Sequence, residues 1–307
     1  MGAYLVRRLL QTVLVMLGVT AITFGAQFLS GDPTLLLLGE TKGMTQEQIQ
    51  AFRHEMGFDR PVLVQYGEWL ERAVQGDFGT SLHYRQSNMG LVMERLPATL
   101  ELTFASLLLA LIVSLPLGVL AAIRRNSWID RIAMLGAMLG QSLPVFWLGI
   151  MLILVFGVAL KWLPVSGRTG WASLILPAIT VGLFSMARNA RMIRSSMLEV
   201  LGADYVRTAR SKGLQERVVV QRHAFRNALI PIVTLIALDF GALLGGAVIT
   251  EQIFAWPGVG RMVLQAINTK DFPLVQASVT ILALTFVLIN LATDLLYTAL
   301  DPRVRLG

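Results

Sequence analysis

The chain has 307 residues, of which 55% are apolar and 15% are charged, whereas a soluble domain carries roughly 25% charged residues. This composition excludes a disordered chain and argues against an ordinary soluble enzyme. Because the chain contains no cysteine, disulfides, thiolate nucleophiles and cysteine-ligated metal sites are excluded. Its three histidines are far apart in the sequence. We therefore predict no metal site, and we expect His54 and His83 at the surface.

Six apolar segments are candidates for membrane crossing, which takes about 20 apolar residues. In chain order they are 9–29, 102–123, 132–160, 172–187, 229–250 and 276–300. The third is too long for a straight crossing and is expected to tilt or break at Pro144, and the fourth is slightly short and contains Pro177. The first is longer than a signal-peptide core and lacks a cleavage site, so we expect it to be retained. The sequence predicts an all-α integral membrane protein with one transmembrane domain, 1–307.

The distribution of basic residues predicts the orientation of these six transmembrane helices. With both termini in the cytoplasm, the inner segments hold 16 of the 26 Lys and Arg residues, and the two short outer loops hold four. An excess of Lys and Arg marks the cytoplasmic side. We therefore expect an extracytoplasmic insertion, 30–101, between the first two helices and a basic cytoplasmic loop, 188–228. Topology explains the net charge of +7 without a nucleic-acid partner.

The cytoplasmic loop contains the pattern of two helices joined at a glycine. Asp204 is a good N-cap for a short helix 205–212, and Gly213 is suited to end it in the left-handed conformation. A second helix is expected from Leu214 into the next span. With the small Ala209 on its surface, the short helix is suited to enter a partner's cleft. The alternatives are a solvated basic loop, a helix on lipid headgroups and a DNA reader, which anchoring at both ends by the membrane disfavours.

Sequence motifs spread over nearly the whole chain resemble one known family. They are DYVRTARSKG and RHAFRNALIP at 204–213 and 222–231, GDP at 31–33, GDFGTS at 76–81, LPATLEL at 96–102, FAWPGVGR at 254–261 and DLLYTALDPRVR at 294–305. The chain resembles permease subunits of binding-protein-dependent ABC importers, within the dipeptide, oligopeptide and nickel permease family. This resemblance implies a type I importer permease in a bacterial inner membrane.

The resemblance also implies partners. They are a second, homologous permease subunit, two ATP-binding subunits, an extracytoplasmic substrate-binding protein and the surrounding membrane lipid. The ATPase-coupling residues would be Asp204, Tyr205, Arg207, Thr208, Ala209, Lys212 and Gly213. Of the Glu-Ala-Ala triplet of the general importer signature, only the last alanine is kept, at Ala209, with Gly213 in register. No contact of a glutamate to the ATPase is therefore expected.

The chain itself lacks the phosphate-binding pattern G-x-x-x-x-G-K-[ST], which cradles nucleotide phosphates. We therefore expect a non-catalytic subunit without a cofactor, with ATP and Mg on the partner subunits. The resemblance implies that it forms half of a pathway for short peptides by alternating access. The alternatives are import of nickel, metal chelates or glutathione by the same machinery, an ion-coupled secondary transporter with Asp239 as its coupling carboxylate, and a membrane receptor.

Polar residues within the predicted spans are candidates for the translocation pathway. Asp239 lies near the middle of 229–250, where a charge costs about 2.5–3.5 kcal/mol, and it either meets substrate or makes an interfacial hydrogen bond. Gln141, Ser142 and Pro144 lie where the third span is expected to break. The Gly136 and Gly140 pair permits close helix approach or a moving gate.

The turn-rich stretch after the fifth span is a candidate external gate. Its residues are Trp256, Pro257, Gly258 and Arg261. The alternative is an aromatic belt at the membrane interface.

Overall fold

The computed structural model describes residues 2–29, 46–55 and 59–300, and the chain divides into two compact units. The first unit is formed by Met1–Pro97 and Met262–Gly307, and the second by Ala98–Arg261. The GDP motif at 31–33 and the basic residues Arg303 and Arg305 lie outside the described residues. Helices connected by turns build both units, and Thr80 and Ser87 form an isolated antiparallel bridge.

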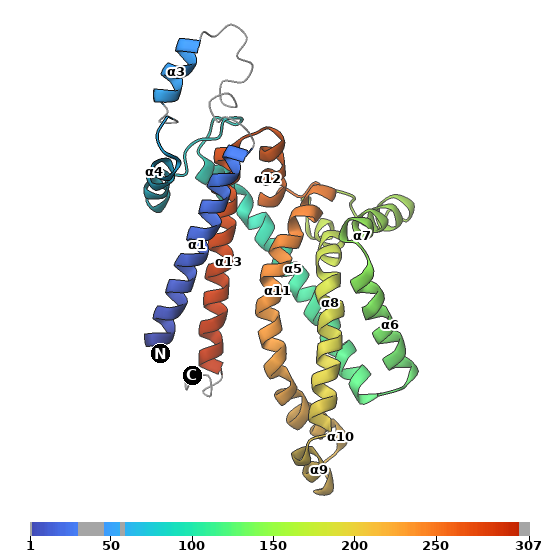
Figure 1. Cartoon of the computed structure of the whole chain (residues 1–307). Coiled ribbons are helices and arrows are strands. Elements are labelled where there is room, and N and C mark those ends of the chain that lie inside the picture. The colour runs from blue at the N-terminus through green and yellow to red at the C-terminus, as the bar shows by residue number, and fades with distance from the viewer. Residues whose placement is uncertain (1, 30–45, 56–58, 301–307) are drawn as a thin grey trace. The chain divides into compact units, whose positions relative to one another are not determined.

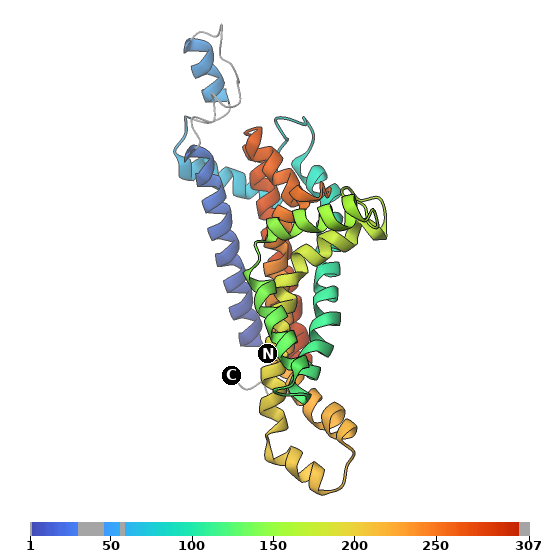
Figure 2. The same cartoon turned by 90° about the vertical axis from the view of Figure 1, so that its right-hand side faces the viewer.

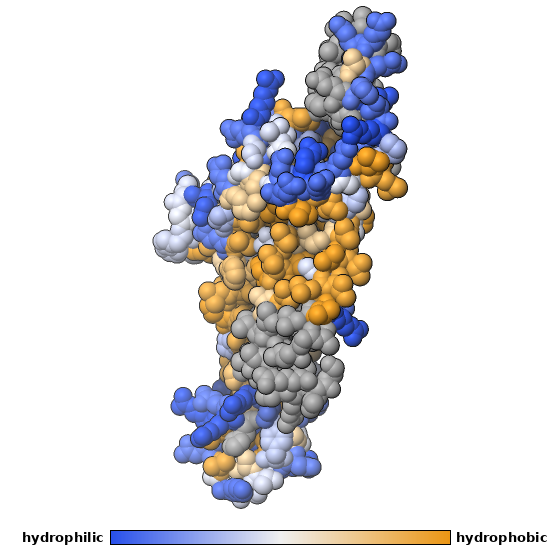
Figure 3. Space-filling model, turned by 90° about the vertical axis from the view of Figure 1, so that its left-hand side faces the viewer, coloured by the Kyte–Doolittle hydropathy of each residue, from blue (hydrophilic) through white to orange (hydrophobic). Residues whose placement is uncertain are grey.

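The first unit contains two long apolar helices, α1 (Gly2–Leu29) and α13 (Phe272–Leu300), which lie side by side (Figure 1). Apolar side chains of α1 such as Leu10, Leu14 and Ile22 are exposed, and Figure 3 shows the apolar surface on this side. Two shorter helices, α3 (Gln46–Glu55) and α4 (Val62–Val74), come from the predicted insertion. The hydroxyl groups of Thr20 and Tyr66 lie 2.8 Å apart and connect α1 to α4.

The GDFGTS motif forms a tight structure in this first unit around the buried carboxylate of Asp271. Ser81 Oγ donates to Asp271 at 2.5 Å, and the backbone N–H of His83 donates to the same oxygen at 3.1 Å. The His83 and His54 side chains are exposed, as predicted.

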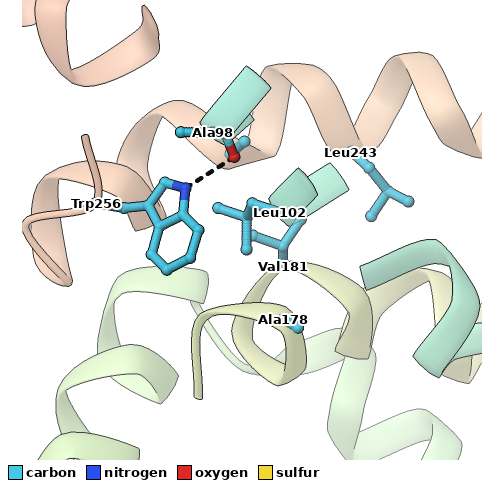
Figure 4. Packing of buried hydrophobic residues seen from close by; sticks show 7 residues of the cluster. Ala98, Leu102, Ala178, Val181, Leu243 and Trp256 are labelled. Atoms are coloured by element: carbon cyan, nitrogen blue, oxygen red, sulfur yellow. Dashed lines mark hydrogen bonds between the residues drawn. The ribbon is translucent and has the colours of Figure 1, made fainter. Parts of the chain in front are cut away.

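The second unit contains the remaining long helices. They are α5 (Asn88–Ile123), which begins in the first unit, α6 (Trp128–Ser142), α8 (Trp171–Leu201) and α11 (Arg226–Ile253). Helices α5 and α8 approach closely at Gly182, which has no side chain. A Cβ atom there would lie only 2.8 Å from the carbonyl oxygen of Ser106. Their core includes Leu102, Val181, Leu243 and Trp256 (Figure 4).

The predicted break of the third span at Pro144 is confirmed. Helix α6 ends at Ser142, and α7 (Val145–Leu152) with the π-helical η1 (Ile153–Ala159) continues at an angle of 106° to it (Figure 2). Proline has no N–H to donate, and Pro144 occupies the N-cap position of α7, where no helical N–H is needed. By contrast, Pro177 lies inside the continuous helix α8.

Several helices are long and apolar enough to cross a membrane. Within the described residues α1, α5, α8 and α13 meet this test, and the bent pair of α6 with α7 and η1 gives a fifth candidate. Helix α8 extends beyond the predicted span 172–187 to Leu201, so the predicted cytoplasmic loop 188–228 begins as a helix.

Candidate functional site

The predicted helix–glycine–helix pattern forms a compact corner, which we call the coupling corner (residues 204–225). It consists of α9 (Asp204–Ser211), a turn, the one-turn α10 (Glu216–Val218) and the π-helical η2 (Val219–Phe225), which leads into α11. Gly213 follows α9 with φ +79°, the left-handed conformation that was predicted. Figure 1 shows α9 and α10 at one end of α8 and α11.

The position of Ala209 differs from the prediction. Ala209 and Val206 are buried and pack against Val219 of η2, with Val200 at the edge of this cluster. Residues three apart lie on the same face of a helix, and this small apolar face holds α9 against its own chain. Ala209 therefore does not lie on the surface that a partner would contact. Asp204 is the first residue of the helix rather than its N-cap, which is Ala203.

The other face of α9 is polar and exposed. Asp204, Arg207, Thr208 and Lys212 are exposed, and Tyr205 is 45% exposed, with its hydroxyl group accepting a hydrogen bond from Asn227 Nδ2 at 3.1 Å. Asp204 and Arg207 form a loose ion pair of 3.8 Å. This face is available to a partner.

An ion pair closes the coupling corner across Gly213. Arg210 donates through Nη2 and Nε to the two carboxylate oxygens of Glu216, at 2.7 and 3.1 Å. These hydrogen bonds lower the pKa of Glu216 and raise that of Arg210. A bidentate ion pair fixes the relative orientation of its two side chains better than a single hydrogen bond, so α9 and α10 are held at a defined angle.

Asp239 is completely buried in α11 and faces polar residues of α8. Its carboxylate accepts hydrogen bonds from Arg188, from Asn189 Nδ2 at 2.6 Å and from Ser185 Oγ at 3.2 Å. The Arg188 side chain is 34% exposed. Two nearby polar atoms, Arg188 Nε and Asn189 Oδ1, are buried without a hydrogen-bond partner in the described structure. The interfacial hydrogen bond expected as one alternative for Asp239 is therefore present, and its partners belong to the same chain.

Arg188 is the first of three arginines of α8, at helical spacing, that contact other helices; we call Arg188, Arg191 and Arg194 the arginine ladder. Arg191 donates to Gln141 Oε1 at the end of α6. Arg194 donates through Nε and Nη2 to the two oxygens of Asp130 at the start of α6, at 2.5 and 2.7 Å. Arg188 therefore connects α8 to α11, and Arg191 and Arg194 connect α8 to α6.

The predicted pathway residues do not form one cluster. Gln141 contacts the arginine ladder, whereas the exposed Ser142 donates to the carbonyl oxygen of Met138, in its own helix, at 3.0 Å. Pro144 is also exposed. The ladder therefore connects Gln141 and Asp239 through different arginines of α8, and Ser142 and Pro144 mark the bend beside Gln141.

The Trp256 side chain is fully buried, so it contributes neither to an aromatic belt nor to an exposed lip. Its indole N–H donates to the carbonyl oxygen of Ala98 at 2.8 Å (Figure 4). It packs in the core of the second unit with Leu102 and Val181. Pro257 and Arg261 are partly exposed and Gly258 is buried, and the Arg261 guanidinium donates to the carbonyl oxygen of Ala255 at 2.9 Å.

A buried carboxylate, which sequence reasoning missed, organises this turn. Glu251 of α11 accepts hydrogen bonds from Thr99 Oγ1 at 2.7 Å and from the backbone N–H of Arg261 at 2.9 Å. A Cβ atom on Gly258 would lie 2.1 Å from Glu251 Oε1. The FAWPGVGR motif is therefore a folded cap around Glu251, and α12 (Val259–Asn268) begins within it.

Further functional candidates were hidden because they interact across large sequence separations. The sequence did not single out Asp130, and Arg194 was only one of the basic residues counted on the inner side. The position of Asp130, two residues before the predicted span 132–160, gave a weak signal, since ionisable residues within membrane segments are usually paired. Among the described residues, no group of three His, Asp or Glu side chains is arranged to hold a metal ion.

Comparison with family models shows matches along the chain. Residues 114–306 match the model described as "Binding-protein-dependent transport system inner membrane component". Residues 1–103 match the model of the N-terminal part of such membrane components.

Curated relatives cover nearly the whole chain. The dipeptide transport system permease protein DppB of Alkalihalophilus pseudofirmus is 41% identical over 99% of this chain and 100% of its own. The glutathione transport system permease protein GsiC of Escherichia coli K12 is 41% identical over 98% of each chain. A solved structure of the MetNI methionine ABC transporter in an inward-facing conformation has a TM-score of 0.57 at 21% identity, over 69% of this chain and 97% of that one. This last likeness concerns the fold.

Proposed function

We propose that this chain, which belongs to the family of binding-protein-dependent transport system inner membrane components, forms half of the translocation pathway of an ATP-driven importer for short peptides. Relatives named as dipeptide and glutathione permeases support peptides as the substrate class. Glutathione is itself a short peptide, so it is the second candidate substrate. Nickel and metal chelates are less well supported as substrates, because neither relative described above is named for their transport.

The proposed assembly contains this chain, a second homologous permease, two ATP-binding subunits and an extracytoplasmic binding protein, in a bacterial inner membrane. ATP and Mg would bind to the partner subunits. We propose six crossings with both termini in the cytoplasm. Four continuous candidates and the bent α6–α7 pair account for five, and the sixth would be α11, which contains the predicted span 229–250. In agreement with this, α1 and α13 place Gly2 and Leu300 at the same end of the first unit (Figure 1).

The coupling corner carries the proposal. Its α9 follows α8 after only Gly202 and Ala203, and its η2 continues directly into α11. The buried contacts of Val206 and Ala209 with Val219 make α9 part of this frame. A partner that moves the exposed face of Asp204, Tyr205, Arg207, Thr208 and Lys212 would therefore move α8 and α11 together.

The same two helices enclose Asp239, which we propose as a pathway residue together with Gln141, Ser142 and Pro144. Arg188 Nε and Asn189 Oδ1 support this, because buried polar atoms without a partner are unfavourable and a polar ligand or water would satisfy them. In the conformation described, Asp239 is closed off by its contacts to α8. Access to Asp239 would require α8 and α11 to separate, which alternating access provides. At the outer end, Pro257, Gly258 and Arg261 remain the proposed gate elements, with Trp256 as their buried anchor.

Substitution of Gly213 by Val tests the coupling role. Valine strongly disfavours positive φ, so the turn is expected to rearrange and α9 to change its angle. In the reconstituted four-subunit importer we expect substrate-stimulated ATP hydrolysis to fall while membrane insertion is unchanged. Gly245→Val is the matched control, because this exposed glycine also has open space around its Cβ position but a helical backbone. Full stimulation in the Gly213→Val complex would contradict the docking assignment.

Uptake assays test the substrate class. Proteoliposomes that contain the complete importer should accumulate a labelled dipeptide when ATP is supplied to the ATP-binding subunits, and unlabelled peptides should compete. Competition by glutathione alone would select the second candidate. Uptake driven by an ion gradient without ATP would instead support a secondary transporter.

A further inference from the structure

An apolar groove of about 420 Å³ lies between α5, α6 and α8 in the second unit. Leu117 contributes from α5, Ile129 and Ile132 from α6, and Leu183 and Met186 from α8. All of its lining residues are apolar, and its volume lies within the range of about 300–1,000 Å³ that is typical of small-molecule sites. A groove of this kind accepts a hydrocarbon chain and offers no group to a polar substrate.

The groove is long enough to cover most of one membrane leaflet. Its lining on α6 extends from Ile129 to Ala137, which corresponds to about 12 Å of helix rise. One leaflet contributes roughly 15 Å of the hydrocarbon core. Gly136 lines the groove, and a Cβ atom at this position would have no neighbour within 4 Å, so the space beside it is open. Gly140, one turn further, instead packs against Leu183 and Ala187.

One end of the groove adjoins a cationic turn, residues 124–131, where the connection after α5 leads into the first turn of α6. Arg124, Arg125 and Arg131 are exposed, and the Arg131 guanidinium lies 5.6 Å from the ring centroid of Trp128. Trp128 is 76% exposed and directly precedes Ile129 of the groove. The acid of this turn, Asp130, is buried and already paired with Arg194. The exposed part of the turn is therefore positive, with an interfacial tryptophan.

From these features we infer that the groove binds one acyl chain of an anionic phospholipid, whose phosphate is held by Arg124, Arg125 and Arg131. Topology alone explains basic residues at this position but not the open groove next to them. A partner's apolar helix would fill the groove but would not require the exposed arginines. Only a ligand that is apolar along one leaflet and anionic at its end matches both. The inference goes beyond the proposed function, on which it depends only for the assignment of the leaflet as the inner one.

Photolabelling of the purified four-subunit complex in lipid nanodiscs tests this site. The probe is phosphatidylglycerol with a diazirine in one acyl chain, and labelled peptides are identified by mass spectrometry. We expect labels on α6 within 129–137 and on α8 near Leu183 and Met186. Gly136→Phe, which fills the groove, should abolish them, whereas Leu139→Phe on the exposed side of the same helix should not.

A second pair of variants tests the headgroup. Replacing Arg124, Arg125 and Arg131 by Gln should lower labelling by the anionic probe by about fivefold for each arginine removed, to the level of a zwitterionic phosphatidylcholine probe. Replacing them by Lys keeps the charge and should preserve most of the labelling.

Three results would overturn the inference. Labelling that is insensitive to Gly136→Phe would place the lipid elsewhere, and equal labelling by both probes would remove the role of the arginines. A disulfide between Gly136→Cys in this cysteine-free chain and a cysteine placed in a partner permease helix would identify the groove as a protein interface. None of these results depends on transport, so failure of this inference is distinguishable from failure of the proposed function.

Discussion

The contact between Arg188 and Asp239 gives the sharpest test of the second unit, through the substitution Asp239→Asn. Asparagine keeps the size of the side chain but removes the charge that three groups of α8 contact. Its amide nitrogen would also face the donor of Asn189 or Arg188. Breaking a buried ion pair costs about 3–5 kcal/mol. Because the Arg188 side chain is 34% exposed, water stabilises the unpaired cation in part, and we expect about 2 kcal/mol.

A double-mutant cycle in the assembled complex measures this quantity. Arg188→Gln, Asp239→Asn and the double variant are compared by thermal unfolding, where 2 kcal/mol corresponds to about 4 °C for a large chain. The double variant leaves no unpaired charge, so it should be more stable than the sum of the two single effects by about 2 kcal/mol. Strict additivity would refute the pairing. Uptake per assembled complex is measured in the same samples, and a selective loss with amine-bearing substrates would support the pathway role.

Three further predictions concern other parts of the chain. Gly258→Ala should lower the yield and thermal stability of the complex, because its Cβ would collide with the buried Glu251 carboxylate, whereas Gly18→Ala, at an open position, should not. Cysteine at Ser87 should react with an impermeant thiol reagent from outside and cysteine at Ser211 only after the membrane is opened; the reverse pattern would refute the topology. Because Arg210 lowers the pKa of Glu216, their pair stabilises the coupling corner at neutral pH. Hydrogen-exchange protection there, corrected for the intrinsic exchange rate at each pH, should decrease as the pH falls through that lowered pKa, and Glu216→Gln should remove this dependence.

Local signals predicted the helices and the two bends. The position of the break at Pro144 and the turn at Gly213 each depend on the chemistry of one residue, namely a missing N–H and a tolerance of positive φ. The lengths of the apolar segments located the helices. The observed helix ends differ from the predicted ones because helices such as α8 continue beyond the apolar segment. The motifs of the family resemblance also lie in folded turns, as the Glu251 cap shows for FAWPGVGR.

The pairing of side chains could not be predicted in the same way. Arg194 and Asp130 are 64 residues apart, and Arg188 and Asp239 are 51 residues apart. Sequence spacing places each of them on a helix, but only packing decides which helices meet. For the same reason the burial of Trp256 was missed, because Ala98 and Leu102, which cover it, belong to a distant part of the chain. The burial of Ala209 was missed although Val219, which covers it, is only ten residues away, because the sharp turn at Gly213 folds η2 back onto α9.

The arginine ladder provides a route by which movement of α9, the proposed docking helix, would reach distant polar groups. Arg188, Arg191 and Arg194 lie on the helix that leads into α9, and their partners lie on α11 and at both ends of α6. Charge-assisted hydrogen bonds require a defined geometry. A shift of α8 along its axis must therefore either move α6 and α11 with it or break these hydrogen bonds. The Arg188 contact includes the fully buried carboxylate of Asp239, whereas Arg191, which contacts Gln141, is exposed. Because exposed pairs contribute little, we expect the Arg191 contact to break before the Arg188 contact. On this reasoning, motion imposed at α9 would free Gln141 beside the α6–α7 bend first and expose Asp239 only when α8 and α11 separate.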